Sequence, residues 1–341
     1  MEAELGVNMD ANQAPLQAPP AAPVPAVAAL PARPLSGRKW GEGMGRFNRV
    51  HPFANLLYSL LFILLALACV LPVVFVIIIS FTDEASIAAH GYSFFPVRWA
   101  ATAYEYLAKM RDTIGRAFLN SLGVTFAGTL LGLTLTTTMG YALSRRTYRL
   151  RKFFTWYIFI PMLFHGGLLS TYVVNTQLLG LKNTYLALIL PLACSSFYVI
   201  ILRTFFSATV PDEIIESGKM DGASQLRIFA QLVLPIALPA IATIGLFLTF
   251  AYWNDWYQAM LYIATNRRDL YPLQYVLVNI EKDITYLTNN ASVMSADSSQ
   301  IMPSETMRMA IVVLIVLPIM FSYPFFQKYF ISGLTIGAVK G

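Results

Sequence analysis

Charged residues, cysteine and histidine are scarce in this sequence. Only 12% of its 341 residues are charged, whereas 57% are hydrophobic, and a soluble globular protein carries about 25% charged residues. This composition excludes an ordinary soluble domain and predicts several membrane spans. The two cysteines, Cys69 and Cys194, lie in separate apolar runs. We expect them to be small buried hydrophobic residues rather than a disulfide or a metal pair.

Catalytic machinery is also missing from the sequence. The phosphate-binding pattern G-x-x-x-x-G-K-[ST] does not occur, so the chain is not expected to hydrolyse ATP by that route. No two of the three histidines, His51, His90 and His165, have the spacing of metal ligands. We therefore expect no enzymatic activity, no metal site and no cofactor held by this chain.

Residues 1–50 differ in composition from the rest of the chain. Their first part is rich in Ala and Pro without periodicity, and such a segment cannot bury enough apolar surface to fold. Early acidic residues and interrupting prolines argue against a signal peptide. Basic residues precede the first apolar stretch and mark its cytoplasmic side. We expect a disordered, then basic, cytoplasmic N-terminus.

Six apolar stretches follow, each able to cross a bilayer that needs about 20 residues. They run over approximately 53–81, 118–143, 153–177, 184–205, 232–251 and 307–326. The second is rich in Gly, Thr and Ser, which permit close helix packing in membranes. Lys and Arg concentrate in the segments expected inside, notably five between 145 and 152, which places both termini in the cytoplasm. The surplus of basic residues, net charge +6, thus reflects membrane orientation rather than nucleic-acid binding.

The predicted fold class is accordingly an all-α polytopic membrane protein. Its six-span domain covers residues 51–331, and a cytoplasmic tail covers 332–341. A polar segment, 207–232, separates the fourth and fifth spans. Pro211 with two following acidic residues opens a helix, Asp221-Gly222 predicts a turn, and Ser224 can cap a second short helix.

This helix-turn-helix resembles the EAA loop of ABC-importer permeases. The family pattern appears as Glu216-Ser217-Gly218, Asp221-Gly222-Ala223 and Leu234-Pro235, with Ser-Gly in place of the family's Ala-Ala. The resemblance implies that the loop docks into a cleft on a cytoplasmic ATPase subunit. The residues it assigns to this coupling are Glu216, Ser217, Gly218, Asp221, Gly222, Ala223, Phe229 and Pro235.

The resemblance extends from about residue 50 to the end of the chain. Tyr252-Trp253-Asn254 and the C-terminal glycines match carbohydrate ABC transporter permeases of the maltose-permease class, the smaller subunit of a heterodimer. Segments 164–174, 184–191, 271–277 and 323–330 are similar to its LplC/YtcP-type branch, although Leu169-Ser170 replaces a usual Ile-Pro. The branch implies import of oligosaccharides from plant or algal polysaccharides, often containing uronic acids; neutral maltose-type oligosaccharides are the alternative.

The resemblance also implies partners and a location. The partners are a second permease subunit, two ATPase subunits that bind MgATP, an extracytoplasmic sugar-binding protein and membrane lipid, and the location is the bacterial inner membrane. It assigns an ATPase contact to the C-terminal residues Gly333, Gly337 and Lys340. A secondary transporter is a distant alternative that should show inverted repeats, which are not evident. A membrane sensor would need neither ATPase nor binding protein.

Four residues are candidates for the translocation path. His165 lies within the third predicted span, where ionisable groups are expensive and usually face a cavity or a partner; a neutral histidine bonded to helix backbone is the alternative. Trp253, Asn254 and Asp255 lie at the outer end of the fifth span. Their aromatic neighbours are either interface anchors or faces on which sugar rings stack while Asn and Asp bind hydroxyl groups.

Overall fold

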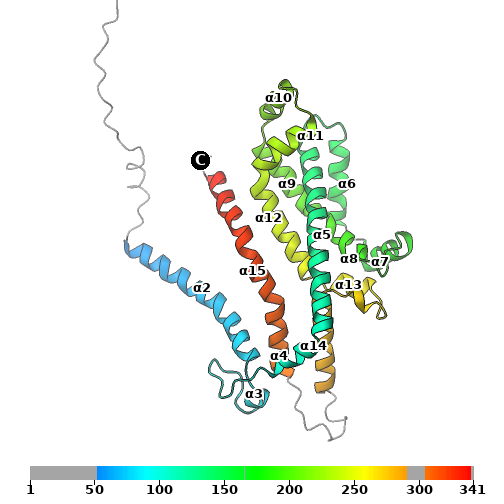
Figure 1. Cartoon of the computed structure of the whole chain (residues 1–341). Coiled ribbons are helices and arrows are strands. Elements are labelled where there is room, and N and C mark those ends of the chain that lie inside the picture. The colour runs from blue at the N-terminus through cyan, green and yellow to red at the C-terminus, as the bar shows by residue number, and fades with distance from the viewer. Residues whose placement is uncertain (1–51, 165, 290–303, 339–341) are drawn as a thin grey trace, which may run out of the picture. The chain divides into compact units, whose positions relative to one another are not determined.

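The computed structural model describes residues 52–164, 166–289 and 304–338 (Figure 1). Within these ranges the regular elements are helical, apart from one isolated β-bridge between Thr82 and Trp99. The chain divides into two units, Met1–Leu64 and Leu65–Gly341. Helix α2 (Pro52–Ser80) begins in the first unit and ends in the second. The predicted all-α class is confirmed, and the expected N-terminal region lies outside the described residues.

Four helical stretches among the described residues are long and apolar enough to cross a membrane. They are α2, α5 (Arg111–Ser144), the run Gln225–Trp253 and the Ser304–Ser322 part of α15 (Ser304–Ala338). A fifth candidate is the pair α8 (Leu186–Ala193) and α9 (Ser196–Thr209), bent by 46°. The bend occurs because Cys194 and Ser195 both have extended backbone angles.

The third predicted span is not a single helix. It is divided into α6 (Arg151–Leu163), α7 (Gly167–Val173) and a π-helix, η1 (Val174–Leu178). Phe164 is extended and Gly167 has a φ of +82°, a conformation that suits glycine and interrupts an α-helix. The count of six spans therefore remains a prediction.

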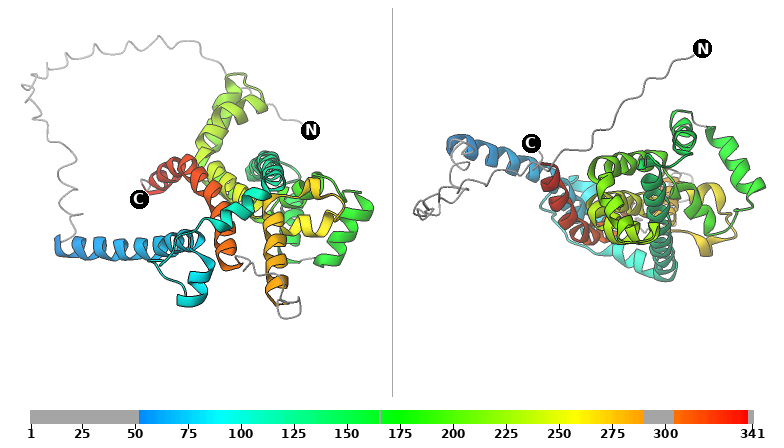
Figure 2. Two further views of the ribbon diagram at one scale, coloured as in Figure 1. Left: turned by 60° about the horizontal axis from the view of Figure 1, so that its bottom comes forward. Right: turned by 90° about the horizontal axis from the view of Figure 1, so that it is seen from above.

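Helix α5 is the element around which the others pack. It contacts α8, α9, α12 (Leu234–Trp253) and α14 (Leu273–Asn289), and the turned views of Figure 2 keep α9 and α12 beside it. A Cβ atom on Gly128 would lie 2.4 Å from the ring of Tyr252, and one on Gly140 would lie 2.9 Å from Cβ of Leu202. Small residues in α5 thus bring helices into close contact, as the composition of this stretch predicts.

The segments expected outside the membrane are partly helical. They contain α3 (Glu84–His90), α4 (Thr102–Lys109), α13 (Tyr257–Tyr262), the 3-10 turn η3 (Arg268–Leu270) and the whole of α14. The carboxylate of Glu84 accepts the backbone N–H groups of Glu305 and Thr306 at 3.0 and 3.1 Å. It therefore caps the N-terminus of α15 from a distant part of the sequence, where the helix dipole favours negative charge.

The expected burial of Cys69 and Cys194 is wrong, since both free thiols are exposed on this chain. An apolar run in a membrane protein has faces that meet lipid or a partner subunit, so apolarity alone does not imply burial within one chain. The same reason accounts for the large hydrophobic side chains exposed along α2, such as Leu60 at 56% and Phe62 at 67%.

Candidate functional site

The polar segment between the fourth and fifth predicted spans forms a helical hairpin of α10 (Asp212–Met220) and α11 (Gln225–Ile228). The N–H of Gly222 donates to the carbonyl of Lys219 and the N–H of Ala223 to that of Gly218, each at 3.0 Å. This is the pair of hydrogen bonds that ends a helix at a left-handed residue. Gly222 has a φ of +74°, so the predicted Asp-Gly turn is confirmed.

The hairpin also has the predicted N-terminal cap. The hydroxyl of Ser224 accepts the backbone N–H of Arg227 at 3.3 Å, and the side chain thereby satisfies one of the free donors at the start of α11. Pro211 precedes α10 directly with φ −64° and ψ 152°, so the helix begins one residue later than a proline at its first position implies. Asp212 and Glu213 occupy the first turn as expected.

Gly218 shows why the segment Glu216-Ser217-Gly218 needs small residues after the glutamate. A Cβ atom there would lie 3.1 Å from Cδ1 of Leu232 and 3.2 Å from Cγ1 of Ile228. Ile228 is fully buried and Ile215 is 6% exposed, so the two arms of the hairpin meet along an apolar seam. Ser217, on the exposed side of α10, donates to its own helix at the carbonyl of Ile214.

Arg145 connects this hairpin to the bundle. Its guanidinium group donates to the carbonyl oxygens of Phe206 and Val210 at the end of α9, at 3.1 to 3.3 Å, and to the carboxylate of Asp212 at 3.0 Å. The side chain is only 9% exposed and lies over the ring of Tyr141. The sequence shows Arg145 as one of several basic loop residues, and nothing in its spacing distinguishes this anchor from its exposed neighbours.

The helix that connects the hairpin to α12 has a wider turn than an α-helix. A π-helix, η2 (Phe229–Val233), precedes Leu234-Pro235, and the N–H of Leu234 reaches back to the carbonyl of Phe229. Pro235 has no N–H to donate, which favours an irregular turn at this point. Phe229 packs on Tyr141 of α5 with ring centroids 4.9 Å apart, so this predicted coupling residue joins the end of the hairpin to the bundle.

The surface of the hairpin around its turn carries apolar side chains that the described residues leave exposed. Met220 is 88% exposed and Leu226 is 80% exposed, on either side of the Asp221-Gly222 turn. Glu216 is exposed on the same hairpin. A large apolar side chain held in water at the tip of a rigid, anchored hairpin is typical of a protein-binding surface.

The candidate path residues at the end of α12 do not share one environment. Trp253 is 7% exposed, packs edge-to-face on Phe118, and donates its indole N–H to the carbonyl of Ile315 at 3.2 Å. Asn254 is exposed and its amide donates to the carbonyl of Phe250 in the preceding turn. In this chain Trp253 thus joins α12 to α15 and α5.

Asp255 lies two residues before the next helix, α13. Its carboxylate accepts the backbone N–H of Gln258 near the start of α13. Burial raises the pKa of Asp255 to about 6, although hydrogen bonds from the backbone of Gln258 and Tyr257 oppose that rise. His165 lies outside the described residues, so the structure does not place it beside the other three.

Asn120 is a polar residue that the sequence interpretation missed. From the N-terminal half of α5, its amide donates to the carbonyl oxygens of Asp269 and Tyr271, and its own oxygen accepts the hydroxyl of Tyr185 at 2.9 Å. It ties the η3 segment and the start of α8 to α5. No sequence signal marks it, because its partners lie 65 and about 150 positions away.

The C-terminal part of the chain is helical beyond the sixth predicted span. Helix α15 continues past the predicted end of the sixth span, through Gly333 and Gly337, to Ala338. Lys340 lies outside the described residues. The predicted contacts of this tail remain predictions.

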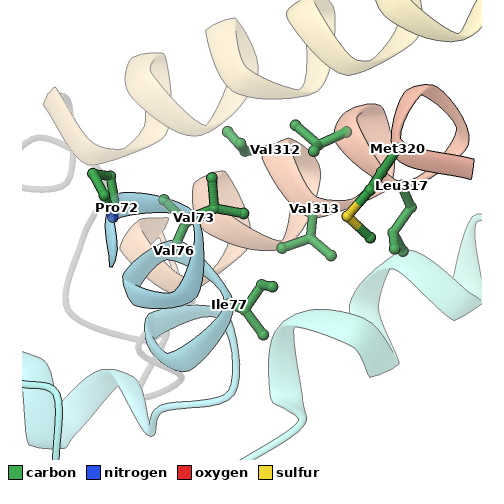
Figure 3. A pocket seen from close by; sticks show the side chains of 9 residues that line it. Pro72, Val73, Val76, Ile77, Val312, Val313, Leu317 and Met320 are labelled. Atoms are coloured by element: carbon green, nitrogen blue, oxygen red, sulfur yellow. The ribbon is translucent and has the colours of Figure 1, made fainter. Parts of the chain in front are cut away.

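An apolar cavity of about 170 Å³ lies between the second half of α2 and α15 (Figure 3). Pro72, Val73 and Ile77 face Val313 and Met320 across it. Its lining side chains are hydrocarbon apart from the thioether of Met320, which is only a weak hydrogen-bond acceptor. The cavity therefore does not provide a site for a hydrophilic solute.

The whole chain was compared with known protein families and with individual known proteins. The profile of the family described as "Binding-protein-dependent transport system inner membrane component" matches residues 128–336. The chain is 37% identical over 289 residues to the polygalacturonan/rhamnogalacturonan transport system permease protein YtcP of Bacillus subtilis (strain 168), covering 85% of this chain and 98% of YtcP. It is 38% identical over 274 residues to Protein LplC of the same organism, covering 80% and 90% of the two chains.

A solved structure is also similar. It is the crystal structure of a bacterial ABC transporter involved in the import of the acidic polysaccharide alginate. The match has a TM-score of 0.68 and 27% sequence identity, and it covers 82% of this chain and 96% of the matched chain.

Proposed function

Because the chain belongs to the family of binding-protein-dependent transport system inner membrane components, we propose that it is one of two permease subunits of an ABC importer for oligosaccharides. Family membership and the similarity to YtcP and LplC confirm the resemblance inferred from the sequence. A permease subunit of this kind spans the membrane several times and is not itself an enzyme. The finer assignments below are part of the proposal.

The α10–α11 hairpin is the coupling element, and its anchoring is the observation that carries this assignment. A movement of the hairpin is transmitted to α9 and α5 because Arg145 bonds the end of α9 and Asp212 together. Met220 and Leu226 offer apolar contacts at its tip, and Glu216 offers a charge. Two cytoplasmic ATPase subunits close on MgATP, and one of them receives this hairpin in a cleft.

The remaining coupling residues have two roles. Ser217, Gly218 and Ala223 keep the hairpin narrow, since the Cβ of a larger residue at Gly218 would meet Leu232. Phe229 and Pro235 direct the hairpin into α12. Gly333, Gly337 and Lys340 at the C-terminal end contact the ATPase pair, and both termini lie in the cytoplasm.

Oligosaccharides containing uronic acids are the proposed substrate class. The support is that YtcP is described as a transporter of polygalacturonan and rhamnogalacturonan and that the structural relative takes part in alginate import. An extracytoplasmic sugar-binding protein delivers the oligosaccharide to the outer mouth formed with the second permease. His165, Asn254 and Asp255 are the candidates for contact with it, and Trp253 holds the outer end of α12 in place.

MgATP hydrolysis by the complex purified gently from its native membrane tests the function. Activity should follow a copurifying ATPase subunit and rise when a sugar-loaded binding protein is added. The sugar that stimulates it identifies the substrate, and stimulation by maltose-type but not by uronate oligosaccharides would replace the proposed substrate class. An intact preparation without a copurifying chain and without ATPase activity would refute the importer.

The coupling assignment has its own test in Gly222→Asp, compared with Gly222→Asn. No heavy atom lies within 4 Å of a Cβ atom built on Gly222, and Asp and Asn both tolerate positive φ, so both variants should insert and fold. The aspartate places a charge in the hairpin tip that must enter the ATPase cleft. We expect Gly222→Asp to abolish transport of the sugar and Gly222→Asn to reduce it much less. Normal transport by Gly222→Asp would show that this turn does not couple.

A further inference from the structure

A strongly basic pocket of about 470 Å³ opens where α5 turns into α6. Five cationic side chains line it, from the turn, from the start of α6 and from α9: Arg146, Arg149, Arg151, Lys152 and Arg203. Helix α6 lies beside α5 in Figure 1 and also contacts α9, and this packing brings the five cationic side chains together from positions up to 57 residues apart.

The cations of this pocket have no acidic partner among the described residues. The four ion pairs among the described residues all involve other basic side chains. One of them is the pair of the neighbouring Arg145 with Asp212. Arg151 and Arg203 are both half-buried and close enough for their charges to repel. Positive charges held together without a counter-charge are costly unless an anion occupies the space between them.

The surface next to the pocket is apolar and exposed. Trp156, which lines the pocket, is 62% exposed, and one face of α6 continues with Ile160 at 50% and Leu163 at 59%. Tyr148 and Trp156 are aromatic residues of the type found at the boundary between lipid headgroups and hydrocarbon. The pocket and the helix face together match a molecule that has an anionic head and a hydrocarbon tail.

We propose that this pocket binds the phosphate headgroup of an anionic phospholipid, whose acyl chains lie along α6. Arginine forks suit phosphate oxygens, and basic pockets between membrane helices bind anionic headgroups. A general preference of basic loops for the cytoplasm accounts for the number of charges. It does not account for their convergence from two elements on one pocket. The site is independent of the transported sugar, so it stands or falls separately from the importer assignment.

Lipid retention by the purified full chain tests the site. Native mass spectrometry from neutral detergent, with phosphatidylglycerol and phosphatidylcholine added in equal amounts, should show phosphatidylglycerol bound preferentially. Arg151→Gln with Arg203→Gln should weaken that binding by about tenfold or more, since each cation near a phosphate contributes to the affinity. Arg151→Lys with Arg203→Lys keeps both charges and should retain most of it.

A matched control removes two charges from the outer side. Lys109→Gln with Arg111→Gln lowers the net charge equally and should leave phosphatidylglycerol retention unchanged; an equal loss there would mean that only total charge matters, and the site would be rejected. Equal retention of the two lipids would also overturn the proposal. Inorganic phosphate or MgATP at millimolar concentration should not displace the lipid. Displacement would assign the pocket to a soluble phosphate instead, and loss of the lipid when ATPase subunits bind would assign it to the protein interface.

Discussion

Replacing Arg145 by Met removes every hydrogen-bond donor of this side chain and keeps an unbranched stem that ends where Nε of the arginine lies. In the native chain the guanidinium group donates to the carbonyl groups of Phe206 and Val210 and pairs with Asp212. These carbonyl groups lie at the C-terminal end of α9, where the helix no longer supplies a backbone donor for each of them. Pro211, which follows Val210, has no N–H to donate. The variant therefore leaves them without their side-chain donor.

The cost can be estimated from the burial of each partner. A buried carbonyl group left without a donor costs about 1 to 3 kcal/mol. Phe206 retains one hydrogen bond, from the N–H of Val210, so its loss is smaller. The side chain of Asp212 is 56% exposed, and a pair of this kind contributes at most about 1 kcal/mol. The sum predicts a loss of about 2 to 4 kcal/mol for Arg145→Met.

Two further variants separate this loss from a general effect of charge. Arg145→Lys keeps the charge but not the planar fork, and should lose about half as much. Arg111→Met removes an arginine from the opposite end of the same helix, where it and Asp112 are 84% and 96% exposed at 3.9 Å. That change should stay within about 0.5 kcal/mol of the native chain.

The assay is the free energy of unfolding of the purified chain, from SDS titration in mixed micelles followed by circular dichroism. Limited proteolysis of the α10–α11 hairpin is a second readout, since loosening at Asp212 should expose it before the bundle unfolds. Unfolding of Arg145→Met at the native free energy would refute the reasoning. So would an equal loss for Arg111→Met, because the effect would then not depend on the buried carbonyl groups.

Two other positions give predictions with internal controls. Gly128→Ala should cost about 1 to 3 kcal/mol because its Cβ would overlap the ring of Tyr252, whereas Gly123→Ala, on the open side of the same helix, should be neutral or stabilising; equal midpoints of thermal unfolding for the two would contradict the close contact. The pKa of Asp255 is raised from 3.8 to about 6, so the folded chain holds this proton more tightly than the unfolded chain, and the contribution of the group to stability is lost as pH rises from about 4 to 6. Between pH 4 and 6, the midpoint of thermal unfolding should therefore fall less for Asp255→Asn than for the native chain. The same dependence of this midpoint on pH in both proteins would count against the raised pKa.

The hairpin was predictable from the sequence because its determinants are local. The N–H groups of Gly222 and Ala223 end α10 through bonds to carbonyl groups three and five positions earlier, respectively, and Ser224 caps α11 through a residue three positions later. Such contacts depend on backbone conformation and neighbouring residue types, which the sequence displays directly. Part of the family resemblance rests on the same short segment, whose pattern of residue types can be compared without knowledge of distant contacts.

Other features depended on distant contacts and were not predictable. Arg145 reads as one more cytoplasmic arginine, and its role appears only when α9 ends beside it. Trp253 was a candidate for the path, yet it packs between Phe118 and Ile315, residues from helices far away in the sequence. The break in the third predicted span is an exception, because the pair Gly166-Gly167 stands there in the sequence and Gly167 takes a φ of +82°.

The sequence by itself determined that this protein spans a membrane, that it is helical, and that a capped hairpin interrupts its spans, because hydropathy and capping act within a few turns of helix. Only the tertiary structure decided which polar residues are structural and which are available to ligands. That choice depends on whether a distant partner is present: Asp212 and two carbonyl groups reach Arg145, while no carboxylate of the described residues forms an ion pair with Arg151 or Arg203.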